Sequence, residues 1–138
     1  MVCIVAQPIL LFSTTNKASL YFVATSIKKF REEYPNSKDY EIISFECNPK
    51  FKSILENTDG ITFHNKAVWI KDGIEKFYIG HGASSSLIHG KTRGNLDFDN
   101  PIEVDCIDLS KWITENFSKD DYIILKMDVE GAEYKVLE

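Results

Sequence analysis

The fold of this chain follows from one stretch, Asp121-Tyr-Ile-Ile-Leu-Lys-Met-Asp-Val-Glu-Gly-Ala-Glu-Tyr-Lys-Val-Leu-Glu138. It begins with a short apolar run, Tyr122 to Leu125, which is rich in β-forming residues and too short for a helix of its own. Such a run predicts a strand that is buried on both faces, as in parallel sheets. Strong helix formers follow from Ala132 onward. A strand, a tight turn and a helix in this order predict the carboxyl edge of an α/β sheet, where ligands bind.

Three acidic residues, Asp128, Glu130 and Glu133, lie within six positions of one another around that turn. They would crowd the sheet edge beside the positive end of the helix dipole, where carboxylates are stabilised. Two interpretations stay open. The carboxylates bind or activate a ligand at the strand exit, or they only cap the helix and complement its dipole. This cluster is the strongest chemical signal in the sequence.

Length and composition are those of one ordinary globular domain: 138 residues, 43% of them hydrophobic and 27% charged. A net charge of −5 offers no basic surface, so we expect no nucleic-acid partner. The three cysteines, Cys3, Cys47 and Cys106, are widely separated and show no CxxC spacing, so neither a zinc site nor a disulfide framework is predicted. Scattered free thiols fit a reducing compartment, and we expect a cytoplasmic protein.

The first residues, Met1 to Phe12, are apolar. No run in the chain approaches the roughly 20 apolar residues that are needed to span a bilayer, so no membrane span is predicted. The start lacks a basic n-region and Gln7-Pro8 interrupts it, so we expect no signal peptide. A buried first strand or a poorly ordered tail is expected there instead.

A second buried strand is predicted at Tyr40-Glu-Ile-Ile-Ser-Phe45, with a helix starting at Pro49. Glu46 stands at the tip of this strand. A carboxylate only accepts hydrogen bonds, and the two neighbouring hydroxyls of a ribose donate two, so Glu46 is a candidate for binding a ribose. The alternative is a solvated charge at a strand end.

The other segments alternate between strand and helix patterns. We predict strands at 20–23, 61–70, 74–79 and 102–107, and helices at 27–34 and 111–117. Lys71-Asp-Gly73 has the composition of a hairpin turn, so 74–79 should pair back on 61–70. This alternation with one inserted hairpin predicts an open, mostly parallel sheet, in which Glu46 and Asp128 face one ligand crevice.

Two positions are candidates for capping each of these helices. Thr25 or Ser26 would cap the first, and Asp108 or Ser110 would cap the second.

The loop Gly80-His-Gly-Ala-Ser-Ser-Ser-Leu-Ile-His-Gly90 is rich in small residues and hydroxyls. It either hydrogen-bonds a polar ligand or forms a plain surface loop. His81 and His89 have no carboxylate partner at a metal-binding spacing, and His64 stands alone on a strand. We therefore predict no metal site, and we expect His64 to be packed or exposed rather than catalytic.

Five segments occur in an informative order along the chain: Ser44-Phe-Glu-Cys-Asn-Pro49, His64-Asn-Lys-Ala-Val68, Gly82-Ala-Ser-Ser-Ser-Leu87, Val104-Asp-Cys-Ile-Asp-Leu109 and Lys126-Met-Asp-Val-Glu-Gly-Ala-Glu133. Together they resemble the FkbM-type methyltransferases. The last segment is the most specific of the five. The resemblance covers 22–138 as a partial domain, and it leaves 1–21 as an unassigned N-terminal segment.

The resemblance implies a Rossmann-like class I methyltransferase that uses S-adenosylmethionine, with a hydroxyl oxygen of a small-molecule or glycan acceptor as the methylated atom. By the same resemblance, Glu46 would hold the ribose hydroxyls of the cofactor, and Asn65 to Ala67 would lie near the adenine. Asp128 would lie beside the methionine end of the cofactor and the acceptor. Glu130 would orient the acceptor hydroxyl or serve as its general base.

The chain departs from the family at two places. No glycine stands between Val23 and Thr25, where the family has a glycine turn against the cofactor, and Gly60 is the only glycine among the first 60 residues. The sequence also ends at Glu138, before the family's later strands. An alternative is therefore an inactive or truncated Rossmann-like remnant that acts as a binding or interaction module. A nicotinamide enzyme is disfavoured because the sequence has no GxGxxG motif.

Overall fold

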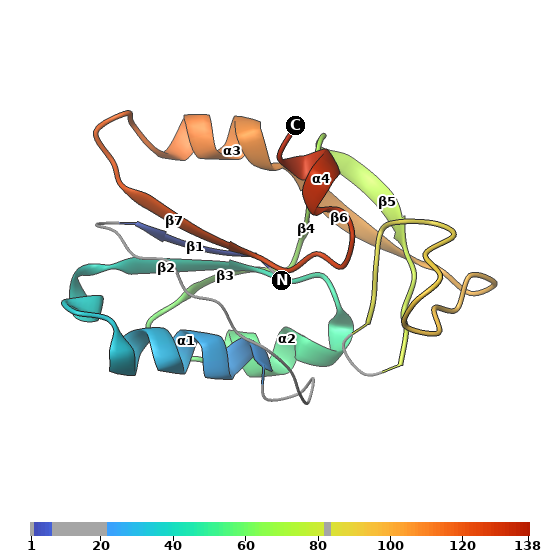
Figure 1. Cartoon of the computed structure of the whole chain (residues 1–138), viewed down its shortest axis with the longest axis horizontal. Helices are drawn as coiled ribbons and strands as arrows, with labels where there is room; N and C mark the ends of the chain where they lie inside the picture. The colour runs from blue at the N-terminus through green and yellow to red at the C-terminus, as the bar shows by residue number, and fades with distance from the viewer. Residues whose placement is uncertain (1, 7–21, 82–83) are drawn as a thin grey trace.

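The computed structural model describes residues 2–6, 22–81 and 84–138, which form an α/β fold with two small sheets (Figure 1). The first sheet has the order β3 (Thr62–His64), β2 (Glu41–Phe45), β1 (Val2–Ala6) and β7 (Ile123–Met127). The second has the order β4 (Ala67–Trp69), β6 (Ile102–Asp108) and β5 (Gly73–Phe77). The helices are α1 (Phe22–Glu33), α2 (Pro49–Glu56), α3 (Leu109–Asn116) and α4 (Glu133–Val136), with a 3-10 helix at Ser37–Asp39. The predicted α/β class is confirmed.

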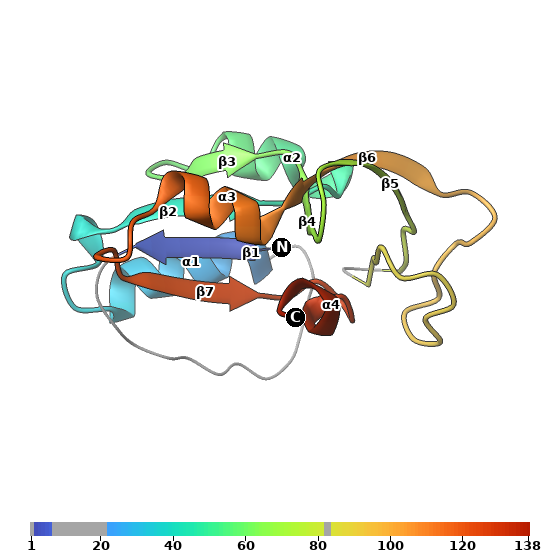
Figure 2. The same ribbon diagram turned by 90° about the horizontal axis from the view of Figure 1, so that it is seen from above.

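Helices cover both faces of the four-stranded sheet: α1 and α2 lie on one face and α3 on the other (Figures 1 and 2). Ile42 of β2 packs in the cluster formed with α1 and α2, whereas Ile43 and Phe45 pack in the cluster on the opposite face. Successive residues of a strand point to opposite faces, so this division is the one that a strand buried on both sides must show. The strand predicted at 40–45 is confirmed.

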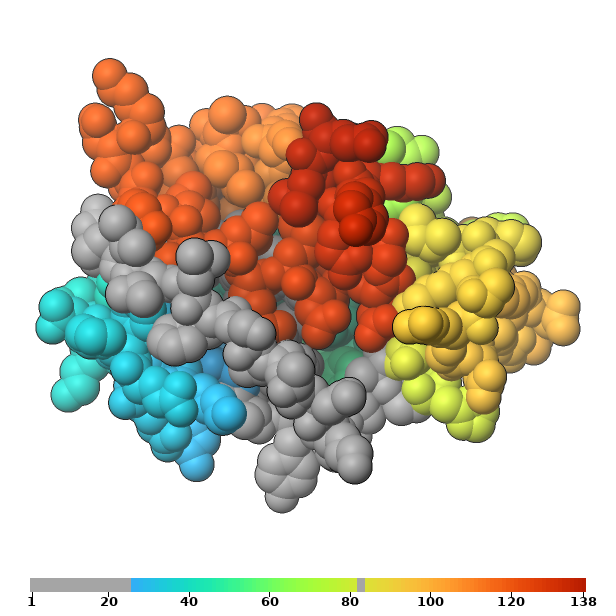
Figure 3. Space-filling model, in the orientation of Figure 1, coloured from blue at the N-terminus to red at the C-terminus, as the bar shows by residue number. Residues whose placement is uncertain are grey.

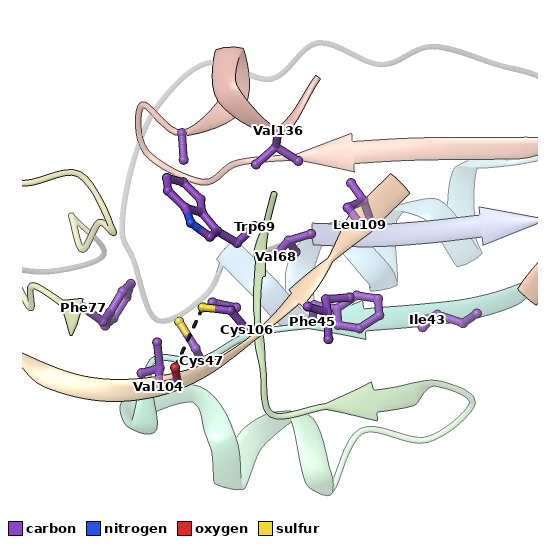
Figure 4. Close-up of a cluster of buried hydrophobic side chains, with 13 residues drawn as sticks. Ile43, Phe45, Cys47, Val68, Trp69, Phe77, Val104, Cys106, Leu109 and Val136 are labelled. Carbon is purple, nitrogen blue, oxygen red and sulfur yellow. Dashed lines mark hydrogen bonds between the residues drawn. The ribbon is translucent and has the colours of Figure 1, made fainter. Parts of the chain in front are cut away.

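The larger core joins the two sheets (Figure 4). It includes residues of β2, β4, β5, β6 and both C-terminal helices: Ile43, Phe45, Cys47, Ala67, Val68, Trp69, Phe77, Val104, Cys106, Ile107, Leu109, Ala132 and Val136. The contact of α4 with this core is what places the turn before it against the rest of the molecule.

The prediction of a mostly parallel sheet is wrong for the described strands. β1 runs antiparallel to both of its neighbours, β2 and β7, and β5 runs antiparallel to β6. The parallel pairs are β2 with β3 and β4 with β6. The reason is that the apolar first segment forms the central strand of the first sheet in the reverse direction. β7, predicted to be buried on both faces, is half-buried along its length because β1 is its one neighbour in the described sheet.

The start of α1 also differs from the prediction. Phe22 and Val23 are helical, so the strand predicted at 20–23 is wrong for these two residues, while Leu20 and Tyr21 lie outside the described residues. Thr25 and Ser26 therefore lie within the helix and do not cap it. A run of four apolar residues has no periodicity that distinguishes a strand from a helix.

The segment 61–70, predicted as one strand, is divided between the two sheets as β3 and β4. The predicted hairpin is also wrong, because β6 lies between β4 and β5. The turn that follows β4 is directed toward the start of α3: the carboxylate of Asp72 accepts a hydrogen bond from the backbone N–H of Asp108 at 3.1 Å and one from Lys111 Nζ at 2.7 Å. The turn therefore makes these long-range hydrogen bonds instead of joining 61–70 and 74–79 as a hairpin.

Two helix starts agree closely with the prediction. Pro49 occupies the first turn of α2, and the Asn48 side chain caps it by accepting a hydrogen bond from the N–H of Lys50 at 3.0 Å. Asp108 caps α3 through the N–H of Lys111, also at 3.0 Å, and Ser110 lies inside the helix. The strand predicted at 102–107 is β6, and 94–101 forms a loop.

Candidate functional site

The carboxyl ends of β2 and β7 lie at the same edge of the first sheet. Val2 of β1 pairs with Phe45 on one side and with Met127 on the other, so the last residues of β2 and β7 stand in one row. Glu46 and Asp128 each follow that row by one residue. Two strand spacings separate their backbones, or about 10 Å. The structure therefore brings these two predicted site residues to one edge, with the beginning of β1 between them.

Glu46 is held in a fixed orientation at this edge. Its side chain is 8% exposed, and Oε1 accepts a hydrogen bond from the backbone N–H of Asn48 at 2.7 Å. The amide of Asn48 in turn donates to the hydroxyl of Ser85 at 3.2 Å. A carboxylate fixed in this way is preorganised to accept further hydrogen bonds from a ligand.

A cavity of about 40 Å³ lies beside Glu46 and is lined also by Lys66, Ala67, Leu87 and Val129. These residues come from four different segments, which meet at the sheet edge. Ala67 is buried at the start of β4, whereas Asn65, two residues earlier, is exposed. Of the pair predicted to lie near adenine, Ala67 therefore faces the cavity beside Glu46 and Asn65 stands at the surface.

The three carboxylates around the turn after β7 lie in different environments. Glu133 accepts hydrogen bonds from the backbone N–H groups of Val129 at 3.0 Å and of Gly131 at 2.8 Å. The Glu133 carboxylate thus has a structural role, but not the predicted one: it holds the turn that precedes α4, and no side chain caps that helix at Ala132. The Asp128 carboxylate is 43% exposed and lies 3.9 Å from the ammonium of Lys126.

Glu130 is held by the loop 84–91. Its backbone is in the left-handed region, with a φ of 52°. Its carboxylate pairs with Lys91 Nζ at 2.5 Å, and its carbonyl oxygen accepts a hydrogen bond from the Ser86 hydroxyl at 3.0 Å. Figure 3 shows this loop and the C-terminal segment in contact on one face of the molecule. Lys91 is a site residue that we did not predict, because a single lysine in a loop carries no pattern.

The buried thiols and His64 are packed in the protein interior or against a neighbouring ring, as side chains with a structural role are. Burial raises the pKa of Cys106 to about 11 and also raises the pKa of Cys47, so both thiols stay protonated near neutral pH. His64 stacks on Phe45 with the ring centroids 4.8 Å apart, as expected for a packed histidine. Partial burial, with a smaller contribution from the charge of Lys66, lowers the pKa of His64.

Within residues 2–6, 22–81 and 84–138, no group of three or more His, Cys, Asp or Glu side chains is arranged to hold a metal ion. No helix among the same residues has the length and apolar character needed to cross a membrane.

A family model described as the methyltransferase FkbM domain matches residues 15–138. The chain belongs to the FkbM methyltransferase family. No curated protein and no solved structure matches it. The resemblance stated from the sequence is thus confirmed, and membership of the FkbM family implies a Rossmann-like fold and the use of S-adenosylmethionine.

The chemical character of the residues at the sheet edge suits the nucleoside half of that cofactor. A buried, oriented carboxylate at a strand tip suits a ribose diol, and the neighbouring cavity has an apolar wall in Ala67, Leu87 and Val129. Its volume of about 40 Å³ suits water molecules, so a nucleoside must displace part of the lining. Between β2 and β7 the described edge presents the start of β1.

Proposed function

We propose that the chain binds S-adenosylmethionine at the carboxyl edge of β2 and β7 and catalyses methylation of a hydroxyl oxygen. One observation carries the proposal: the buried carboxylate of Glu46, fixed by the N–H of Asn48, stands on the same sheet edge as Asp128. The family supplies the type of reaction, and this geometry supplies residues that suit it. A small molecule or a glycan with a free hydroxyl is the acceptor class that we propose.

Each residue at the edge has a role in this proposal. Glu46 accepts hydrogen bonds from the ribose hydroxyls, and its buried setting makes those bonds stronger than they would be in water. Asn65 and Ala67 lie near the adenine, with Ala67 forming part of its apolar wall. Asp128 lies beside the methionine end and the acceptor.

When bound, the cofactor would supply a methyl group on a positively charged sulfur, and its methyl carbon would be the electrophile for the acceptor oxygen. The acceptor hydroxyl must lose its proton, and a carboxylate within hydrogen-bond distance can take it. Asp128 and Glu130 are the two candidates. Each carboxylate lies beside a lysine, but Glu130 is 2.5 Å from Lys91 whereas Asp128 is 3.9 Å from Lys126. The closer pair is the harder one to leave, so Asp128 is the better base and Glu130 the better orienting group.

The test is a calorimetric titration of the purified chain with S-adenosylhomocysteine. Wild-type chain should bind, and Glu46→Ala should weaken binding by about 1–3 kcal/mol because a charged hydrogen-bond acceptor is lost. Glu41→Ala is the matched control: it removes an exposed carboxylate from the opposite end of the same strand and should leave binding unchanged. Equal binding by wild type and Glu46→Ala would refute the assigned role of Glu46.

The second candidate is a folded but inactive member of the family that acts as an interaction module. The reversed direction of β1 and the small cavity favour it, because together they leave the methionine half of the cofactor without a glycine turn among the described residues. The same titration separates the candidates. A chain that unfolds cooperatively on heating, and is therefore folded, but shows no heat of binding with S-adenosylhomocysteine would support the inactive form.

A further inference from the structure

The backbone of the acidic turn requires support from outside it. Glu130 and Gly131 follow one another with φ angles of 52° and 100°. Glycine adopts positive φ without strain, whereas a residue with a Cβ does so at a cost of about 1–3 kcal/mol. Glu130 stays in this conformation only where contacts hold it there. Part of this support is local, because the Glu133 carboxylate accepts from the N–H groups of Val129 and Gly131 on either side of Glu130.

Among the described residues, the long-range contacts that hold Glu130 itself come from the loop 84–91. Ser86 is 1% exposed, and its hydroxyl donates to the carbonyl oxygen of Glu130 while accepting from the N–H of Ile88 at 3.1 Å. Lys91, whose side chain is 17% exposed, pairs with the Glu130 carboxylate. The loop thus contacts Glu130 twice, at its backbone carbonyl through Ser86 and at its carboxylate through Lys91. Removing one partner of a pair this well shielded leaves the other charge poorly solvated, which costs more than breaking a typical surface pair.

The same loop touches the candidate ligand site. Leu87 lies next to Ser86 and Val129 lies next to Glu130, and both line the cavity beside Glu46. The turn also fixes the direction in which Asp128 leaves β7. We propose that Lys91 is a positioning residue: by holding Glu130 in the left-handed conformation, it keeps Val129 and Asp128 in place at the ligand site. The ligand part of this inference rests on the proposed function, whereas the hold on the turn does not.

The experiment is a cycle of four proteins: wild type, Lys91→Met, Glu130→Gly and the double variant. Glycine at position 130 adopts the left-handed conformation unaided, so Lys91 should become dispensable in that background. Two measurements are made on each protein, the melting temperature without ligand and the dissociation constant of S-adenosylhomocysteine. Lys91→Arg is included because it keeps the charge and should retain most of the wild-type behaviour.

We expect Lys91→Met to lower the melting temperature by about 3–5 °C. It should also weaken S-adenosylhomocysteine binding by about tenfold, because the competent turn becomes a minor population. In the Glu130→Gly background the same substitution should change both quantities by much less. Non-additive melting temperatures would show that Lys91 stabilises the chain through Glu130, and non-additive dissociation constants would show that this coupling extends to the ligand site.

Two results would overturn the inference. Equal loss of binding on Lys91→Met in both backgrounds would mean that Lys91 contacts the ligand itself. Additive changes of melting temperature, or no change, would mean that Lys91 does not hold the turn. If wild-type chain binds no S-adenosylhomocysteine, the proposed function fails, but the melting-temperature cycle still decides the role of Lys91.

Discussion

The turns after β2 and after β7 have the same plan, a strand followed by a carboxylate and then a helix, but they are held in different ways. After β2, Glu46 accepts from the N–H two residues later, and Asn48 accepts from the N–H two residues after itself. After β7, Glu130 is held by Ser86 and Lys91, which are 44 and 39 residues away in sequence. The turn after β2 is supported mainly by its own residues, whereas the turn after β7 combines local support from the Glu133 carboxylate with support from a distant loop.

This difference bears on what each turn can do. The turn after β2 is buried and is hydrogen-bonded to the start of α2. It therefore suits a role that needs a fixed geometry, such as holding a ribose. The turn after β7 depends on the loop 84–91, and any change in that loop alters the environment of Asp128. Ser85 accepts a hydrogen bond from Asn48 in the first turn, and Ser86 donates one to Glu130 in the second. The loop therefore connects the two turns physically. Substitutions in the loop should therefore affect the second turn more than the first.

The largest effect is expected from Gly80→Ala, at the base of the loop. An added Cβ would overlap the carbonyl oxygen of Ser84 and lie 2.5 Å from that of Gly94, so the backbone must shift. We expect a loss of about 2–3 kcal/mol in the free energy of unfolding. Hydrogen exchange should show loss of protection in the turn 128–133 and α4 before α2.

Gly90→Ala is the control for that substitution. Gly90 has a φ of 80°, and apart from its chain neighbours no atom of the described residues lies within 4 Å of an added Cβ, so only backbone strain of about 1 kcal/mol is introduced. If Gly80→Ala lowers protection in α2 and α4 to the same extent, the loop does not support the second turn selectively.

A smaller effect is expected from removing the local support of the first turn. Asn48→Ala deletes the cap on Lys50 N–H and the hydrogen bond to Ser85, and should cost about 1–2 kcal/mol in urea unfolding. Asn48→Asp keeps the capping oxygen and loses only the donor to Ser85, so it should recover part of that loss. If the two variants are equally unstable, the cap does not stabilise this turn.

The features predicted correctly from sequence are the locally determined ones. The start of α2 was predicted from Pro49 and that of α3 from Asp108 or Ser110, because each signal is within a few residues of its helix; the Asn48 cap was not predicted. The strand preceding α2 was also predicted, because a dense apolar run is needed to bury both faces. The placement of Glu46 and Asp128 at one edge follows from the direction of two strands that are not neighbours.

The features missed are those that distant contacts decide. Nothing local to residues 2–6 specifies that this strand enters the sheet in reverse between β2 and β7. The break at Asn65 and Lys66 accompanies the entry of β4 into a different sheet, and β6 inserts between β4 and β5 although it lies far from both in sequence. Lys91 was missed for the same reason, since its partner lies 39 residues away.

The smallest effect is a pH dependence of stability near the first turn. Partial burial beside Phe45, assisted by the charge of Lys66, holds the pKa of His64 below its value in the unfolded chain. The unfolded state therefore binds the proton first as pH falls, so the contribution is fully present above pH of about 6.5 and is lost below it. Urea unfolding of wild type and His64→Phe at pH 7.5 and 5.5 measures this contribution. The fall in stability should be smaller in the variant, and identical falls would show that the stacked imidazole does not contribute to the pH dependence.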